Sequence, residues 1–139
     1  MTKEEDIAKN LSVIEYYKEQ LNSLDLQIQY MQAAVADYHK ARLTVEQLHN
    51  ADDKSEILIP VGGGSFIYGS VNDSSKVFVD IGAGLVAEKT VDDAVKKIDE
   101  RIKTLQENQE KLLSMAQKIQ TEATELSQKT QKLMEETKK

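Results

Sequence analysis

Four glycines and the only proline of this 139-residue chain fall within one stretch, ILIPVGGGSFIYGSV at residues 57–71. A glycine run after an apolar strand can cradle a phosphate, because bare backbone N–H groups can approach the ligand closely. A P-loop, however, needs Lys-Ser or Lys-Thr after its last glycine, and here Ser65 and Phe66 follow Gly64. A dinucleotide-binding fingerprint would need a third glycine where Ile67 stands. The stretch therefore predicts a tight corner with positive φ and no nucleotide cofactor.

The other groups that could do chemistry show no catalytic or metal-binding arrangement. His39 and His49 are the only histidines, and their ten-residue separation does not place them on one helix face in a ligand spacing. The acidic pairs at residues 52–53 and 92–93 could bind hard metal ions, but a linker and a helix start explain them better. The chain has no cysteine, which excludes disulfides and thiolate sites. We therefore expect no enzyme activity, no metal and no cofactor.

Composition favours a long-helix protein. Charged residues make up 30% of the chain and aromatic residues only 5%, which is typical of coiled coils. The net charge of -6 gives no bulk attraction for nucleic acid. No apolar run approaches the length of a membrane span, and the charged start MTKEEDIAKN lacks the apolar region of a secretory signal. The expectation is a soluble cytoplasmic protein that binds neither nucleic acid nor membranes.

Two segments without glycine or proline, residues 1–50 and 90–139, carry apolar residues in heptad rows. The two rows of the first segment are Ile7, Ile14, Leu21, Ile28, Val35 and Tyr17, Leu24, Met31, Tyr38, Val45. The two rows of the second are Val95, Ile102, Gln109, Ala116, Ala123, Thr130 and Val91, Ile98, Leu105, Leu112, Ile119, Leu126, Leu133. Asn10 and Arg42 interrupt the first segment, and Leu11 is expected to carry the stripe beside Asn10. The rows predict two long helices that pair as an antiparallel coiled coil, with both chain ends at one tip.

Residues 51–89 hold all six glycines and predict two β-hairpins at the base of the coil, which makes the fold class α+β. The predicted strands are residues 57–61, 66–71, 76–81 and 85–89. Thr90 is then expected to cap the second helix. Two-stranded hairpins are marginal alone in water, and free strand edges invite pairing. We therefore expect the strands to assemble with other chains through Ile57, Ile59, Phe66, Ile67, Val77, Val79, Ile81, Leu85 and Val86.

The tip of the coil combines large side chains with small ones. The small or polar positions are Asn10, Ala116, Ala123 and Thr130. Such residues cover large neighbours poorly, so the large ones should stay partly exposed or the helices should splay. Ordinary fraying and an adhesive tip for apolar segments of other proteins both fit this pattern. The expected contact residues for such segments are Ile7, Leu11, Ile14, Leu126, Leu133 and Met134.

Over essentially its whole length the chain resembles the α-type subunit of prefoldin, a cochaperone. The specific marks are Ile59-Pro60-Val61-Gly62, Gly64-Ser65-Phe66, Gly82-Ala83-Gly84 and the acidic start of the second helix. The short termini and the lack of cysteine favour an archaeal-type member. The resemblance implies a hetero-hexamer of two α-type and four β-type subunits, joined through their hairpins into an inter-subunit β-barrel. It also implies a holdase that grips unfolded clients at its coiled-coil tips and delivers them to a group II chaperonin, independently of ATP.

A structural coiled-coil adaptor is the alternative hypothesis. In that case the β segment would oligomerise the chain, and the arms would bind one defined partner helix. Such a protein would show one saturable partner, whereas a holdase would bind many unfolded clients. In both cases residues 1–139 are expected to form one domain, made of a helix arm (1–50), a linker with two hairpins (51–89) and a second helix arm (90–139).

Overall fold

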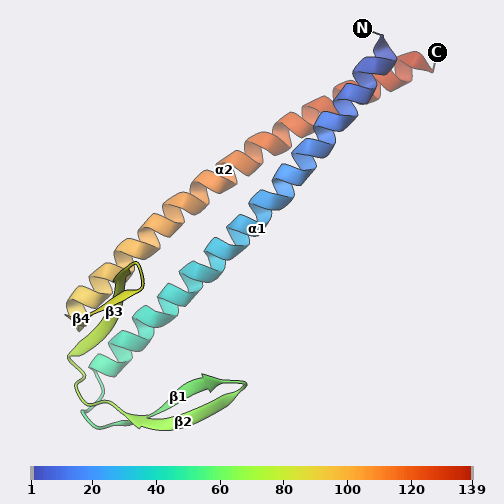
Figure 1. The fold of residues 1–139 in the computed structure, drawn as a ribbon. Coiled ribbons are helices and arrows are strands. Elements are labelled where there is room, and N and C mark those ends of the chain that lie inside the picture. The colour runs from blue at the N-terminus through green and yellow to red at the C-terminus, as the bar shows by residue number, and fades with distance from the viewer. Residues whose placement is uncertain (1, 139) are drawn as a thin grey trace. The chain divides into compact units, whose positions relative to one another are not determined.

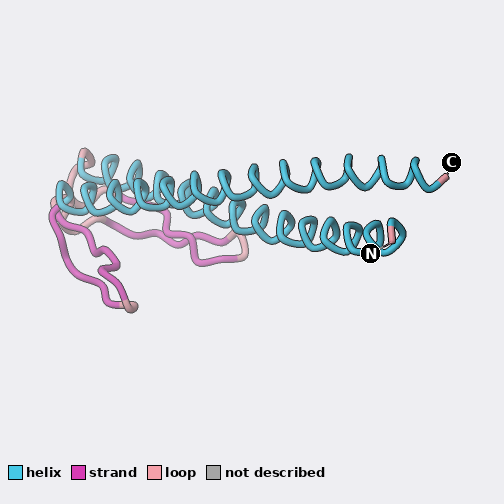
Figure 2. Tube along the Cα trace, turned by 90° about the horizontal axis from the view of Figure 1, so that it is seen from above, coloured by secondary structure: helices cyan, strands magenta, loops and turns pink. Residues whose placement is uncertain are grey.

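The computed structural model describes residues 2–138 as two long helices and four strands (Figure 1). The elements are α1 (Lys3–His49), β1 (Glu56–Gly62), β2 (Ser65–Ser70), β3 (Lys76–Gly82), β4 (Leu85–Thr90) and α2 (Val91–Thr137). Figure 2 shows the same elements from above, with helices and strands in separate colours. The predicted helices and strands are confirmed, with small shifts at their ends, and so is the α+β class.

The chain divides into two compact units. The first unit holds α1 up to Ala34 and α2 from Leu105 onward, and the second is Val35–Thr104. In the first unit the two helices run antiparallel, and the two chain ends lie at the same end (Figures 1 and 2). There Lys3 Nζ lies 3.2 Å from Glu136 Oε2. The second unit contains both hairpins, and the assignment of the whole chain to one domain stays a prediction.

The heptad rows are the covered positions of both helices. Every member of the four rows is buried or half-buried, and the fully buried members are Leu24, Ile28, Val91, Ile98, Ile102, Ala123 and Thr130. Asn10 is half-buried, whereas Leu11 is 47% exposed, so the expectation that Leu11 carries the stripe was wrong. The reason is geometric: one residue turns an α-helix by about 100°, which rotates Leu11 off the paired face.

Arg42 occupies a heptad core position by pairing with acidic residues. Its Nε donates to Asp99 Oδ1 at 2.6 Å, and its Nη2 donates to Asp99 Oδ2 at 3.4 Å. Its Nη1 lies 2.9 Å from Glu46 Oε1. The hydrogen bond that Arg42 donates to Asp99 is the main cause that raises the pKa of Arg42. A half-buried charge is tolerated here because both carboxylates satisfy it, and the contact with Asp99 favours one register between the helices.

Threonine side chains cap the start of both helices. Thr90 Oγ1 accepts the backbone N–H of Asp93 at 3.3 Å, which confirms the predicted cap of α2. Thr2 Oγ1 accepts the backbone N–H of Glu5 at 3.1 Å, and the Thr2 N–H donates to Glu5 Oε2 at 3.4 Å. This reciprocal pair is a capping box at α1, which was not predicted.

The two hairpins repeat the same pairing twenty positions apart. In β1–β2 the paired residues run from Glu56 with Ser70 to Gly62 with Ser65. In β3–β4 they run from Lys76 with Thr90 to Gly82 with Leu85, and each of these residues lies twenty positions after its counterpart. Each ladder is irregular at the same place, just before its turn. Equivalent strand positions of the two hairpins can therefore be compared directly.

The turns of the two hairpins have the same backbone conformation. The φ angles are 101°, 57° and 73° at residues 62–64, and 116°, 53° and 75° at residues 82–84. Positive φ is open to glycine at little cost, and every one of these positions except Ala83 is glycine. The glycine stretch is thus a corner between strands, as predicted, and no helix follows it to receive a phosphate.

Hydrogen bonds connect the linkers that precede β1 and β3. The backbone N–H of Ser74 donates to Asp53 Oδ1 at 3.0 Å, and the His49 ring Nδ1 lies 3.2 Å from the Ser74 carbonyl oxygen. Asp73 Oδ1 accepts the backbone N–H of Ser75 at 2.9 Å, a side-chain bond that is typical of turns. The hydrogen bonds from the Ser75 hydroxyl and N–H lower the pKa of Asp73. His49 and Asp53 therefore have structural partners in the linkers.

Candidate assembly and client-binding surfaces

Hairpin β1–β2 carries apolar side chains on both faces. Successive residues of a strand point to opposite faces. The pairing therefore puts Leu58 beside Tyr68 on one face and Ile59 beside Ile67 on the other. The exposed fractions of these four residues range from 39% for Ile59 to 81% for Tyr68. Large exposed apolar surfaces mark interaction sites, and this hairpin exposes two of them.

Hairpin β3–β4 has a first face with Val77, Val79 and Lys89 and a second face with Phe78 and Glu88. Val77 and Val79 are half-buried on the first face. On the second face Phe78 pairs with Glu88, and Lys76 Nζ lies 3.4 Å from Glu88 Oε1. Each hairpin is a two-stranded sheet within the described residues, so its outer strand edges have no strand partner in this chain. The two hairpins therefore have the same backbone conformation but different side chains on their faces.

A groove of about 590 Å³ separates β3 from the helices of the second unit. Val77, Val79 and Ile81 line it from the strand, and Tyr38 and Val45 line it from α1. Asp80 of β3 and the charged residues Lys97, Glu100 and Arg101 of α2 also line it, so the groove has a mixed polar and apolar surface. Successive residues of β3 line the groove, so both faces of this strand border it.

All nine predicted assembly residues lie on strands. The half-buried members are Ile57, Val77 and Val79, and the exposed members are Ile59, Phe66, Ile67, Ile81, Leu85 and Val86. Whether they contact partner chains stays a prediction. Four further strand residues with comparable or greater exposure were missed, namely Leu58, Val61, Tyr68 and Phe78. Reading each strand as two faces, and asking whether both are apolar, would have found them.

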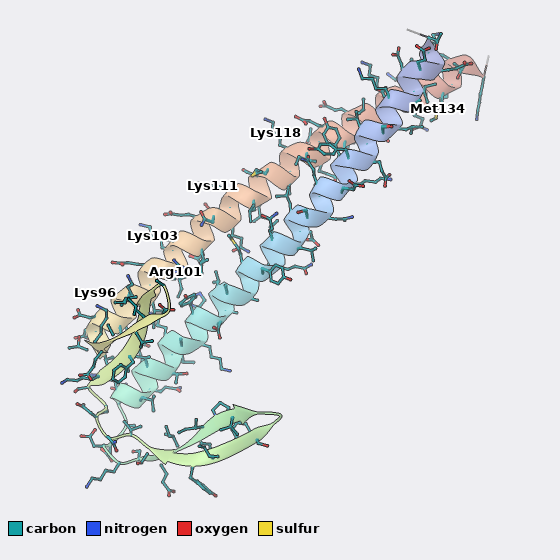
Figure 3. The ribbon with its side chains drawn as sticks, viewed as in Figure 1. Lys96, Arg101, Lys103, Lys111, Lys118 and Met134 are labelled. Carbon is teal, nitrogen blue, oxygen red and sulfur yellow. The ribbon has the colours of Figure 1, made fainter. Side chains whose placement is uncertain are left out.

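All six predicted client-contact residues lie in the first unit. Leu11 is 47% exposed, and the half-buried members are Ile7, Ile14, Leu126, Leu133 and Met134. Figure 3 shows Met134 near the end of α2. The large residues thus remain partly exposed, which is one of the two arrangements expected for the tip. Their contact with clients stays a prediction.

The small residues of this unit let its two helices close. Ala123 is 9% exposed and Thr130 is 2% exposed, so the alternative of splayed helices is not seen at these positions. The Thr130 hydroxyl donates to the Leu126 carbonyl at 2.7 Å, which satisfies it within the helix. At Tyr17, desolvation and the neighbouring Glu122 raise the pKa of the phenol. The buried contact between the two helices, the seam of the coil, therefore continues toward the chain ends.

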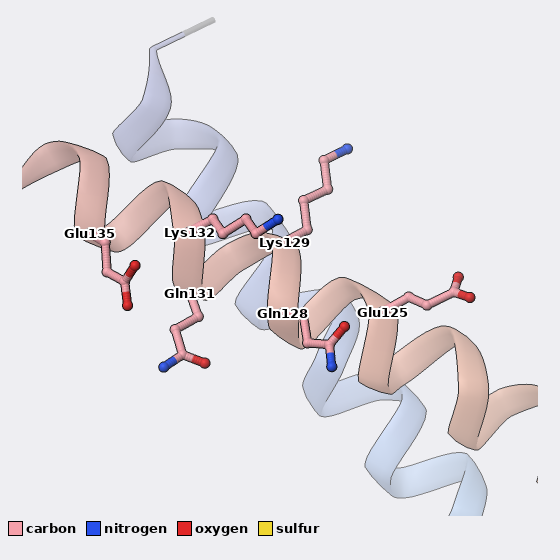
Figure 4. A pocket seen from close by; sticks show the side chains of 6 residues that line it. All are labelled: Glu125, Gln128, Lys129, Gln131, Lys132 and Glu135. Atoms are coloured by element: carbon pink, nitrogen blue, oxygen red, sulfur yellow. The ribbon is translucent and has the colours of Figure 1, made fainter.

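The outer side of α2 near its end is polar. A hollow of about 550 Å³ is lined there by Glu125, Gln128, Lys129, Gln131, Lys132 and Glu135 (Figure 4). All six side chains end in a polar or charged group. No group of three or more potential metal ligands occurs among residues 2–138. Neither described helix is long and apolar enough to cross a membrane.

Comparison with known proteins shows whether the chain is a generic coiled coil or a member of a defined family. The family model described as "Prefoldin subunit" matches residues 17–136. The chain belongs to the prefoldin family. It is 36% identical over 98 residues to prefoldin subunit alpha of Methanosarcina barkeri, covering 68% of each chain. It is 32% identical over 96 residues to prefoldin subunit alpha of Archaeoglobus fulgidus, covering 69% of this chain and 70% of the relative.

Solved prefoldin structures share the fold. A cryo-EM structure of filamentous PFD from Methanocaldococcus jannaschii matches with a TM-score of 0.62 and 26% identity, over 90% of this chain and 98% of that one. The crystal structure of the prefoldin beta subunit from Thermococcus strain KS-1 matches with a TM-score of 0.60 and 21% identity, over 91% and 90% of the two chains. The predicted resemblance to prefoldin is confirmed. Membership of this family supports a cochaperone role and assembly with other prefoldin subunits.

Proposed function

We propose that this chain is the α-type subunit of an ATP-independent holdase that binds non-native polypeptides at its coiled-coil tip. Membership of the prefoldin family carries the proposal. The tip supports it, because Leu11 is 47% exposed and its large neighbours are only half-buried. Several weak apolar contacts on linked arms give useful affinity through avidity, without selecting one client sequence.

The proposed complex contains two copies of this chain and four β-type subunits. Its hairpins would join those of the partners in an inter-subunit β-barrel, and closing the sheet would remove the free edges of β1–β2 and β3–β4. The complex would act in the cytoplasm and hand its clients to a group II chaperonin. It would use no catalytic step, nucleic acid or membrane.

Two exposed leucines on α1 provide a matched test of the tip. Leu11 is 47% exposed near the chain ends, and Leu26 is 56% exposed further along the same helix. Burial of a half-exposed leucine contributes about 1 kcal/mol, so Leu11→Ser is expected to weaken client binding about fivefold. Leu26→Ser should leave it unchanged. The measurement is the concentration of complex that halves the aggregation of a denatured test enzyme, with assembly checked by size-exclusion chromatography.

Equal losses in the two variants would show that the tip has no special role. As a larger change, deletion of residues 1–11 and 126–139 should remove the contribution of these arms and leave assembly intact. Full protection by that truncated complex would overturn the tip proposal. A single saturable partner, with no protection of unfolded proteins, would favour the adaptor.

A further inference from the structure

Helix α1 has an apolar stretch on the side opposite its seam. Residues 26–36 contain no charged residue, although charged residues make up 30% of the chain. Leu26 is 56% exposed and Tyr30 is 75% exposed, whereas Ile28 between them is buried in the seam. Leu26 and Tyr30 are about one helical turn apart, so their side chains lie together on the outer side. This part of α1 is therefore apolar on two sides.

The outer side of α2 has no such stretch. Its outermost heptad row is exposed and polar, and consists of Glu100, Glu107, Ser114, Thr121, Gln128 and Glu135. The outermost row of α1 is also exposed, and consists of Glu5, Ser12, Glu19, Leu26, Ala33, Lys40 and Gln47. A row that faces only water needs no apolar side chain, as α2 demonstrates. The cluster of Leu26, Tyr30 and Ala33 therefore marks a surface for a partner.

The charged residues at the two ends of this cluster have opposite signs. Glu19 lies seven residues before Leu26, and Lys40 lies seven residues after Ala33 in the same row. Neither charged residue takes part in an ion pair within residues 2–138. When a second α1 runs antiparallel across the centre of the cluster, Glu19 of each copy faces Lys40 of the other. Leu26 then faces Ala33, which sets a large side chain against a small one.

The row beside this one agrees with the antiparallel arrangement. Tyr30 lies near the twofold axis and faces its own copy, and exposed aromatic residues are enriched where proteins associate. Ser23 faces Asp37, whose carboxylate can accept a hydrogen bond from the serine hydroxyl. A parallel pair in register would instead place Glu19 beside Glu19 and Lys40 beside Lys40, which is unfavourable. The charges thus select the antiparallel pairing.

We propose that two copies of this chain pair through the outer sides of α1, with the helices antiparallel and the cluster at the centre. The partner is a second copy because the row is complementary to itself in both charge and side-chain size. The contact is only one helix face wide, so isolated chains are expected to pair weakly. A complex that holds more than one arm raises the effective concentration of the pairing surfaces. The pairing is separate from client binding at the tip.

Thiol crosslinking tests the pairing, because the chain contains no cysteine of its own. One variant carries Glu19→Cys, a second carries Lys40→Cys, and the matched control carries Glu107→Cys in the outer row of α2. Two variants at a time are mixed, reconstituted with the natural partners of the chain and treated with a short bis-maleimide. Joined peptides are identified by mass spectrometry. We expect position 19 to join position 40, and to do so more often than it joins position 19 or position 107.

Two crosslinking results would overturn the inference. Crosslinks of positions 19 and 40 each to its own copy would show parallel pairing. An equal yield with position 107, or no crosslink between copies, would show that the outer side of α1 forms no defined contact. These yields do not depend on the protection of unfolded proteins, so the pairing and the proposed function can fail separately.

A charge exchange provides a second measurement. Gln29→Cys lies near the twofold axis and is expected to join its own copy. In that background Glu19→Lys should lower the crosslink yield about tenfold, because it sets like charges against each other at both ends of the contact. Adding Lys40→Glu should restore the yield. A loss that the second exchange does not restore would contradict the proposal.

An unfolded client is the other occupant that an apolar helix face could take. In that case Leu26→Ser would weaken the protection of clients as much as Leu11→Ser does, and it would leave the crosslink at position 29 unchanged. That result would overturn the pairing. We expect the reverse, with client protection retained and the crosslink yield reduced, because a serine replaces the larger apolar side chain at the centre of the contact.

Discussion

At the residue scale, the two hairpin turns form a natural comparison of glycine with alanine. Gly63 has a φ of 57° and the equivalent Ala83 a φ of 53°. No atom lies within 4 Å of a Cβ placed on Gly63, so the difference between the two positions is conformational. A non-glycine residue in this left-handed region costs about 1 kcal/mol. The second turn therefore carries a strain that the first avoids.

Exchange of these two residue types should shift stability in opposite directions. Gly63→Ala is expected to lower the free energy of unfolding by about 1 kcal/mol, and Ala83→Gly to raise it by up to about the same amount, because part of the gain is lost to the flexible unfolded chain. The urea midpoint of the assembled complex measures both. Shifts in the same direction would show that contacts of the turns, rather than φ, decide the result.

At the element scale, the apolar alternation of β3 places Val79 on the half-buried face and Asp80 on the exposed one. The Asp80 carboxylate accepts the backbone N–H of Gly82 at 2.7 Å and so stabilises the turn. Neighbouring residues of one strand thus serve different purposes, one in packing and one in the local backbone conformation. This division is typical of a strand with one covered face.

Substitutions at these two adjacent positions are therefore expected to differ sharply in their effect on assembly. Val79→Asp is expected to disrupt assembly, because it places a charge at a half-buried position between apolar neighbours. Asp80→Asn should be tolerated, since an amide oxygen can still accept the Gly82 N–H. Size-exclusion chromatography with the β-type subunits distinguishes the outcomes. An intact complex that contains Val79→Asp would argue that this face stays in water.

At the scale of the whole molecule, the exposed hairpins make the isolated chain incomplete. Both faces of β1–β2 are apolar and uncovered, and the strand edges of both hairpins lack partners within the described residues. Such surfaces promote association unless another chain covers them. Assembly is therefore expected to be part of the folded state rather than an optional step.

Native mass spectrometry of the chain isolated with its natural partners would measure this composition directly. We expect a hetero-hexamer with two copies of this chain and four of a β-type subunit. A homo-oligomer, or a complex with one unrelated partner, would contradict the proposed composition and favour the adaptor. The same measurement on the Leu11→Ser complex is the control that separates client binding from assembly.

The sequence by itself determined the elements, because their signals are local. Heptad rows, strand alternation and glycine corners depend on neighbours a few residues apart, so α1, α2 and the four strands could be predicted. The sequence also indicated the candidate residues at the tip and on the strands. The three-dimensional fold decided which of them are covered, since burial depends on residues far apart in the chain. Leu11 turns away from the seam, Thr130 closes it, and Ile59 and Ile67 remain uncovered where Val79 and Ala87 are half-buried.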